Sequence, residues 1–191
     1  MKVKKVNVGL VGLGMVCESH LKAYSAHPDA EVIAVCDLDA ARLKEIANKY
    51  GIPKTYTAYE QMLQDPEINT VDITTPTILH SPMALAAAMA GKNILCEKPF
   101  CLTLTEGQEV CEAAHTQGVT LMVGESYIFM TSLKQARTLI DAGEIGKPQQ
   151  IRQQFGSWVE RPGVLETGRP VTDDHRGWRI GSKKAGGAGF P

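Results

Sequence analysis

The fold is decided by residues 6–17, which read VNVGLVGLGMVC. The first six are mostly apolar and predict a buried strand that leads directly into Gly12 and Gly14. These match the first two glycines of the dinucleotide fingerprint G-x-G-x-x-G. Gly12 permits the tight turn, and Gly14 lets the backbone N–H groups of Met15 and Val16 approach a pyrophosphate at the start of a helix. Two glycines alone also suit a purely structural turn.

Asp37 supplies the second half of this pattern. Cys17 occupies the third glycine position, and Asp37 follows the predicted strand 32–36, 20 residues further on. That separation is expected of a carboxylate that hydrogen-bonds the adenosine ribose hydroxyls. The carboxylate would repel the 2′-phosphate of NADP, and the adjacent Leu38 offers no positive charge, so the sequence favours NAD. Arg42, about one helical turn on, leaves NADP use open.

Residues 6–123 alternate short apolar runs with helical patterns, which is typical of the doubly wound parallel sheet of an α/β Rossmann domain. Three helices have recognisable N-caps at Asp39, Ser81 and Thr103, the last with Glu106 in a capping box. The six expected strands include residues 6–11, 32–36, 70–74, 93–96 and 119–123, with a shorter unit around residues 59–63. The expected helices cover residues 18–27, Asp39 to Gly51, Ser81 to Gly91, and Thr103 to about Gly118.

A change of pattern divides the chain into two predicted domains, residues 1–123 and 124–191. In the second, we expect a helix over residues 132–142 and an extended segment over residues 149–159. Residues 160–191 carry too little apolar material for a core of their own. We therefore expect this part to be the start of an α/β domain that is incomplete in this sequence.

The composition disfavours several classes of function. The 20 Lys and Arg residues nearly balance the 21 Asp and Glu residues without long runs of one sign, so neither nucleic acid nor a membrane surface is an expected partner. Five cysteines without a CxxC pair indicate buried thiols in a reducing compartment and no metal site. No stretch reaches the roughly 20 apolar residues of a membrane span, and Asn7 interrupts the signal-peptide-like start. The sequence predicts a cytoplasmic protein.

Two further strand ends carry polar residues. Thr75-Pro76 and Glu97-Lys98 follow predicted strands, at the carboxyl edge where doubly wound sheets bind ligands. An ammonium at Lys98 would polarise a substrate hydroxyl or carbonyl during hydride transfer. The alternative is a surface lysine paired with Glu97. His20 and His80 stand at helix starts, and we interpret both as donors to the backbone rather than catalysts.

These motifs resemble the Gfo/Idh/MocA oxidoreductases, a family named after glucose-fructose oxidoreductase and inositol dehydrogenase. The shared elements are Gly12-x-Gly14 with His20, Thr75-Pro76 with His80, Glu97-Lys98-Pro99, Gly143-x-x-Gly146 before Pro148, Trp178-Arg179, and Gly186-Gly187. The resemblance implies an NAD(P)-binding Rossmann domain, with Lys98 as the catalytic lysine and a commonly cis Pro99. It also implies a mostly antiparallel α/β second domain that completes the substrate pocket and often forms homo-oligomers.

The leading hypothesis is an oxidoreductase that transfers a hydride between NAD(H) and a secondary alcohol or ketone of a sugar, cyclitol or related polyol. Two alternatives stay open, an NAD-dependent glycoside hydrolase and a non-catalytic NAD-binding or regulatory protein. The resemblance places an acid/base histidine after Gly186-Gly187, where this sequence has none, so we expect the chain alone to bind NAD without turnover. His175, near Trp178 and Arg179, could line a sugar pocket or belong to an ordinary charged loop. The candidate cofactor-binding residues are Gly12, Gly14, Met15, Val16, Asp37, Leu38, Thr75, Pro76, His80, Glu97 and Lys98. The candidate substrate-binding residues are Lys98, His175, Trp178 and Arg179.

Overall fold

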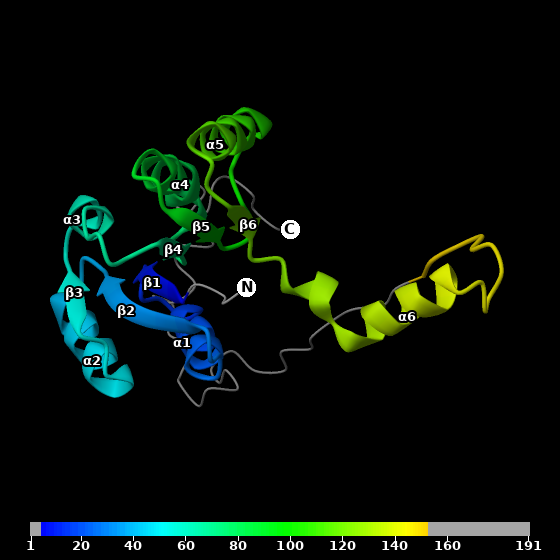
Figure 1. Ribbon diagram of the computed structural model, residues 1–191, viewed down its shortest axis with the longest axis horizontal. Helices are drawn as coiled ribbons and strands as arrows, with labels where there is room; N and C mark the ends of the chain where they lie inside the picture. Colours follow the sequence, from blue (N-terminus) through cyan, green and yellow to red (C-terminus); the bar gives the residue numbers. More distant parts are fainter. Residues whose placement is uncertain (1–4, 153–191) are drawn as a thin grey trace, which may run out of the picture. The chain divides into compact units, whose positions relative to one another are not determined.

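A computed structural model describes residues 5–152, which form two compact units that divide between Gly124 and Glu125 (Figure 1). The first unit contains the sheet, and the described part of the second contains a short 3-10 helix followed by an α-helix. Across residues 5–152, no helix combines the length and the apolar character that crossing a membrane requires.

The first unit is built on a six-stranded sheet in the order β3-β2-β1-β4-β5-β6, with every neighbouring pair parallel (Figure 1). The chain starts in the middle of the sheet, builds outward to β3, returns to β4 and builds outward to β6. This is the doubly wound Rossmann arrangement, so the predicted fold class is confirmed. The strands are β1 (Val6–Val11), β2 (Ala30–Cys36), β3 (Lys54–Tyr56), β4 (Thr70–Ile73), β5 (Asn93–Cys96) and β6 (Leu121–Val123).

The helices begin and end largely where local signals place them. Asp39 accepts hydrogen bonds from the N–H groups of Ala41 and Arg42, and Gly51 closes the same helix in the left-handed conformation. Thr103 and Glu106 form the predicted capping box. The helices of the first unit are α1 (Cys17–Ser25), α2 (Ala40–Tyr50), α3 (Tyr59–Leu63), α4 (His80–Met89) and α5 (Leu104–Gln117).

Two local predictions need correction. Ser81 is not an N-cap: a 3-10 helix over Thr77–Leu79 runs directly into α4, so Ser81 lies inside the helix and is buried. The third strand, β3, precedes the short unit predicted around residues 59–63, which is α3. Because β3 has only three residues at the sheet edge, its sequence shows no clear period-2 pattern.

Two hydrophobic clusters pack against the sheet. One contains Leu10 and Val35 from the strands, with side chains of α1 and α2. The other contains Val11 and Ile73 from the strands, with side chains of α3, α4 and α5. Because successive strand residues point to opposite faces, Leu10 and Val11 contribute to different clusters. This buries both sides of the strands and fixes their ends at a common edge.

The second unit holds a 3-10 helix at Ser126–Phe129 and α6 (Thr131–Asp141), which matches the predicted helix over residues 132–142. Gly143 follows in the left-handed conformation. Residues 149–152, the start of the predicted extended segment, have no regular secondary structure. The rest of that segment and the Gly-rich stretch over residues 160–191 lie outside the described residues.

Candidate active site

The predicted cofactor residues meet at one edge of the sheet. The turn at Gly12 follows β1, Asp37 follows β2, Thr75 lies just after β4, and Lys98 lies just after β5. All strands are parallel, so these four positions share the carboxyl edge. A doubly wound sheet binds ligands at this edge.

The turn after β1 requires glycine at its first position. Gly12 has a φ of 91°, and its N–H donates to the Cys36 carbonyl at 2.9 Å. A Cβ on Gly12 would lie 2.8 Å from the backbone nitrogen of Thr75 and 2.9 Å from the carbonyl carbon of Thr74. A Cβ on Gly14, by contrast, would meet no protein atom within 4 Å. The turn thus packs tightly against β4 at Gly12 and leaves room for a ligand at Gly14.

Asp37 holds this turn as well as facing the cofactor edge. Its Oδ2 accepts the N–H of Leu13 at 2.6 Å, and its Oδ1 accepts the N–H of Asp39 at 2.9 Å. The Thr74 hydroxyl lies 2.6 Å from the Gly12 carbonyl oxygen, to which it donates. The ribose-binding carboxylate proposed from the sequence is therefore fixed by its own turn before any ligand arrives. Thr74 is a positioning residue that sequence reasoning missed.

The Arg42 guanidinium is already engaged. Its Nε donates to the Leu13 carbonyl at 3.0 Å, and its two terminal nitrogens bind Glu45 at 2.8 Å and Glu18 at 3.2 Å. These contacts orient the side chain along the glycine turn and neutralise its charge. In this arrangement Arg42 provides no free positive charge for a 2′-phosphate.

The N-terminus of α1 fits a pyrophosphate. Its N-cap residue, Val16, makes no side-chain capping hydrogen bond. The first N–H groups of a helix lack the usual i−4 carbonyl partner and carry the positive end of its dipole; in α1, the Ser19 N–H donates to the Val16 carbonyl at 3.0 Å. Met15 and Gly14 are exposed beside them. The donors and the room at Gly14 together suit the phosphates of a dinucleotide.

Lys98 is exposed at the end of β5, and its peptide bond to Pro99 is cis, as the resemblance implies. Its backbone N–H donates to Glu97 Oε2 at 2.8 Å. Within residues 5–152, no ion pair joins the Lys98 ammonium to Glu97. Glu97 thus binds the backbone N–H of Lys98, while the positive charge of the Lys98 side chain also lowers the pKa of Glu97, so both interpretations of Lys98 stay predictions.

His80 links the two strand ends that flank the site. The side chain is buried, with Nδ1 2.7 Å from the Pro99 carbonyl oxygen and Nε2 2.8 Å from the Thr75 carbonyl oxygen. Carbonyl oxygens only accept hydrogen bonds, so the imidazole is the donor toward this backbone. The interpretation of His80 as a donor to the backbone is confirmed.

His20 behaves differently from its sequence-based interpretation. Its ring binds two carboxylates rather than the backbone: Nδ1 lies 2.7 Å from Asp72 Oδ2, and Nε2 lies 3.3 Å from Glu97 Oε1. Burial disfavours a charged imidazole, but hydrogen bonds to both carboxylates outweigh it and raise the pKa of His20 to about 9. Burial would raise the pKa of Glu97, yet hydrogen bonds from His20 and the Lys98 N–H hold it below its usual value.

Asp72 was missed, although the sequence contains a signal for it. It is a carboxylate in the middle of the apolar strand β4 and is fully buried. A buried charge needs a charged or hydrogen-bonding partner. The sequence therefore requires a partner for Asp72 without saying that it is His20. The candidate substrate residues His175, Trp178 and Arg179 lie outside the described residues.

The raised pKa of His20 predicts a pH-dependent stability. The folded pKa exceeds the unfolded value near 6.5, so the stabilisation is fully present below about pH 6.5 and is lost as the pH rises through about 9. We expect a loss on the order of 3 kcal/mol in the free energy of unfolding between pH 6 and pH 10. Urea unfolding of the wild type and of His20→Gln measures it. An equal pH dependence in both proteins would contradict this assignment.

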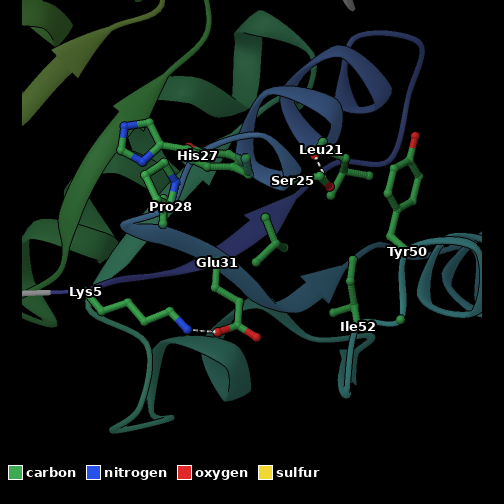
Figure 2. Close-up of a pocket in the computed structure, with 12 residues that line it drawn as sticks. Lys5, Leu21, Ser25, His27, Pro28, Glu31, Tyr50 and Ile52 are labelled. Atoms are coloured by element: carbon green, nitrogen blue, oxygen red, sulfur yellow. Dashed lines mark hydrogen bonds and ion pairs between the residues drawn. The ribbon is translucent and has the colours of Figure 1, made fainter.

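A separate hollow of about 290 Å³ lies at the opposite, amino edge of the sheet (Figure 2). It lies where α1 and α2 end and β2 begins, and it contains the exposed ion pair between Lys5 and Glu31. Its lining residues are Lys5, Leu21, Tyr24, Ser25, His27, Pro28, Ala30, Glu31, Val32, Tyr50, Gly51 and Ile52. Among the described residues that line it, none is a candidate cofactor-binding or substrate-binding residue.

Known proteins resemble this chain in sequence and in fold. A family model described as "Oxidoreductase family, NAD-binding Rossmann fold" matches residues 6–125. The chain is 33% identical to D-apiose dehydrogenase of Paraburkholderia graminis, over 90% of this chain and 47% of that protein. It is 34% identical to inositol 2-dehydrogenase of Salmonella typhimurium, over 76% of this chain and 44% of that protein.

Among solved structures, an oxidoreductase from Agrobacterium radiobacter in complex with NAD⁺, L-tartaric acid and magnesium matches with a TM-score of 0.73 and 26% identity. The match covers 76% of this chain and 42% of that one. The chain thus spans a little under half the length of these relatives. The prediction of an NAD-binding Rossmann domain is confirmed.

Proposed function

Because the chain belongs to the Gfo/Idh/MocA oxidoreductase family, we propose that the protein transfers a hydride between NAD(H) and a secondary alcohol or ketone of a sugar, cyclitol or related polyol. The observation that carries the proposal is the exposed Lys98 at the same sheet edge as the glycine turn and Asp37. Sugar and polyol dehydrogenases among the relatives support the substrate class. The cytoplasmic location and a homo-oligomer formed through the part after residue 124 stay predictions from the sequence.

Different residues of this edge would bind different parts of NAD(H). The N–H groups at the start of α1 would face the pyrophosphate, and the Asp37 carboxylate would accept hydrogen bonds from the adenosine ribose. Leu38 is exposed directly after Asp37 and offers an apolar surface beside that ribose. NAD(H), when bound, supplies the hydride acceptor and donor of the reaction. The chain's own residues hold the cofactor and act on the substrate oxygen.

Lys98 is the group proposed to act on that oxygen. Its ammonium is exposed and, among the described residues, forms no ion pair within contact distance, although its charge lowers the pKa of Glu97; it can hydrogen-bond a hydroxyl or carbonyl. A positive charge there stabilises negative charge that develops on the substrate oxygen as the C–H bond breaks. Of the described residues, Lys98 is the one we place in contact with substrate.

The role of Asp37 gives a test of the cofactor preference. Replacing Asp37 with Ala should weaken NAD binding by about 1–3 kcal/mol, because a charge-assisted hydrogen bond to the ribose is lost. It should also reduce the ratio by which the protein binds NAD more tightly than NADP. Calorimetric titration with both cofactors measures this change. Asp39→Ala is the matched control: it removes the α2 cap, costing about 1 kcal/mol of stability, and should leave the preference intact. Equal or tighter NADP binding in the wild type would overturn the assignment.

Product analysis tests the reaction itself. The complete enzyme should reduce added NAD⁺ in proportion to the polyol or sugar that it oxidises. Release of a sugar from a glycoside without net NADH formation would instead support the glycosidase alternative. NAD binding without either product, across a panel of sugars, cyclitols and their glycosides, would support a non-catalytic role.

A further inference from the structure

A continuous line of polar contacts connects the interior of the sheet to the backbone of Lys98. Asp72 on β4 binds Nδ1 of His20 on α1 at 2.7 Å, and Nε2 of His20 lies 3.3 Å from Glu97 Oε1. The other oxygen of Glu97 accepts the Lys98 N–H at 2.8 Å. The line joins three elements that lie far apart in the sequence.

The inner end of this line is rigid. Asp72 is fully buried, and β4 pairs with β1 on one side and β5 on the other. Its Oδ2 faces the imidazole of His20, whose side chain is itself largely buried. Tyr24 on α1 also faces Asp72, and burial raises the pKa of its phenol, so it stays neutral beside the pair. The His20 ring is therefore held by a carboxylate that is buried in the middle of the sheet.

The outer end of the line would be flexible without His20. A glutamate side chain has three rotatable bonds and loses considerable entropy when ordered. Here each carboxylate oxygen of Glu97 has a partner, one in His20 and one in the Lys98 N–H. Contact with a rigid imidazole fixes the carboxylate in the position that also binds the backbone of Lys98.

The backbone of Lys98 is held on its other side as well. The carbonyl oxygen of Pro99, the next residue, lies 2.7 Å from Nδ1 of the buried His80. Two histidines from different helices therefore secure the backbone on both sides of Lys98. Only its side chain is left free to extend toward the edge of the sheet.

We propose that His20 is a positioning residue for Lys98, which it orients through the carboxylate of Glu97. The consequence for turnover rests on the proposed function, whereas the link itself concerns the backbone of this chain. The link predicts a local effect. Removing His20 should lower the global stability, because the buried Asp72 loses its partner, and it should release the Lys98 N–H by more than this global change.

Amide hydrogen exchange followed by NMR tests the link without any cofactor or substrate. In His20→Ala, the Lys98 amide should exchange at least about tenfold faster, while the core amides of Leu10 and Val35 keep their protection relative to global stability. Glu97→Ala, which removes the acceptor, should have the same effect on Lys98, and the double variant should add little. His115→Ala, which changes an exposed histidine on α5, is the control. A purely structural role would instead raise exchange at all three amides together.

Glu97→Ala keeps the inference testable if His20→Ala does not fold, because it leaves the buried Asp72–His20 pair in place. In the complete enzyme, both variants should lower kcat about tenfold or more, with KM for NAD changed less than about threefold. An unchanged Lys98 amide in both variants would overturn the positioning role. If the Lys98 amide is released but Lys98→Met retains normal turnover, the link stands and the proposed function fails.

Discussion

Replacing Lys98 with methionine is expected to lower the turnover of the complete enzyme at least about 100-fold while leaving NAD affinity nearly unchanged. A loss of that size follows when a positioned charge-stabilising or proton-transferring group is removed. Methionine retains most of the length of the side chain, and the exposed Lys98 ammonium contributes no ion pair to the described fold. The change should therefore affect the chemical step and spare the fold.

The measurement combines kcat at saturating substrate with calorimetric NAD binding. Lys44→Met, which changes an exposed lysine on α2, is the matched control and should behave as wild type in both assays. Turnover close to normal in Lys98→Met would show that Lys98 is an ordinary surface lysine without a catalytic role. Loss of NAD binding together with turnover would instead place Lys98 in cofactor binding alone.

The second large effect is expected at the glycine turn, where two similar substitutions should differ. Gly12→Ala places a Cβ 2.8 Å from the Thr75 backbone nitrogen and forces alanine to adopt a φ of 91°. Together the strain and the clash should cost at least about 2 kcal/mol of folding stability and distort the cofactor edge. Gly14→Ala should leave stability nearly unchanged, because its Cβ meets no protein atom within 4 Å.

Gly14→Ala should nevertheless weaken NAD binding at least about tenfold, or about 1.4 kcal/mol, since its Cβ enters the space that a pyrophosphate needs. Thermal unfolding and calorimetric titration of the two variants separate the effects. Each glycine thus has its own expected signature, loss of fold for Gly12 and loss of ligand for Gly14. Unimpaired NAD binding by Gly14→Ala would show that the pyrophosphate does not bind at this turn.

The sequence predicted the parts of the fold that local chemistry controls. The apolar run before Gly12, the Asp39 cap and the capping box at Thr103 each have a physical cause within a few residues, and the structure contains all three. The wrong prediction of an N-cap at Ser81 also came from a local signal. A serine before a proline is a good N-cap signal, but the preceding 3-10 turn already starts the helix.

The site was predicted as a set of strand ends and not as a network. Lys98 and Asp37 were found because the fingerprint and the sheet edge assign positions along the chain. The partners of His20 lie 52 and 77 residues away in the sequence, and no local pattern specifies which carboxylates an imidazole meets. Long-range contacts of this kind depend on how α1 packs over the sheet, which a single sequence does not reveal.

The strand order also sets a length scale for whatever binds at the carboxyl edge. Asp37 follows β2 and Lys98 follows β5, and with β1 and β4 between them the two residues are three strand spacings apart, about 14 Å. A mononucleotide whose ribose is bound by Asp37 is too short to reach Lys98. The strand spacing therefore sets the minimum length of a ligand that can contact both residues. An extra strand between β1 and β5 would move Lys98 too far from Asp37 for one dinucleotide to connect the ribose site with the reacting substrate, even with both residues unchanged.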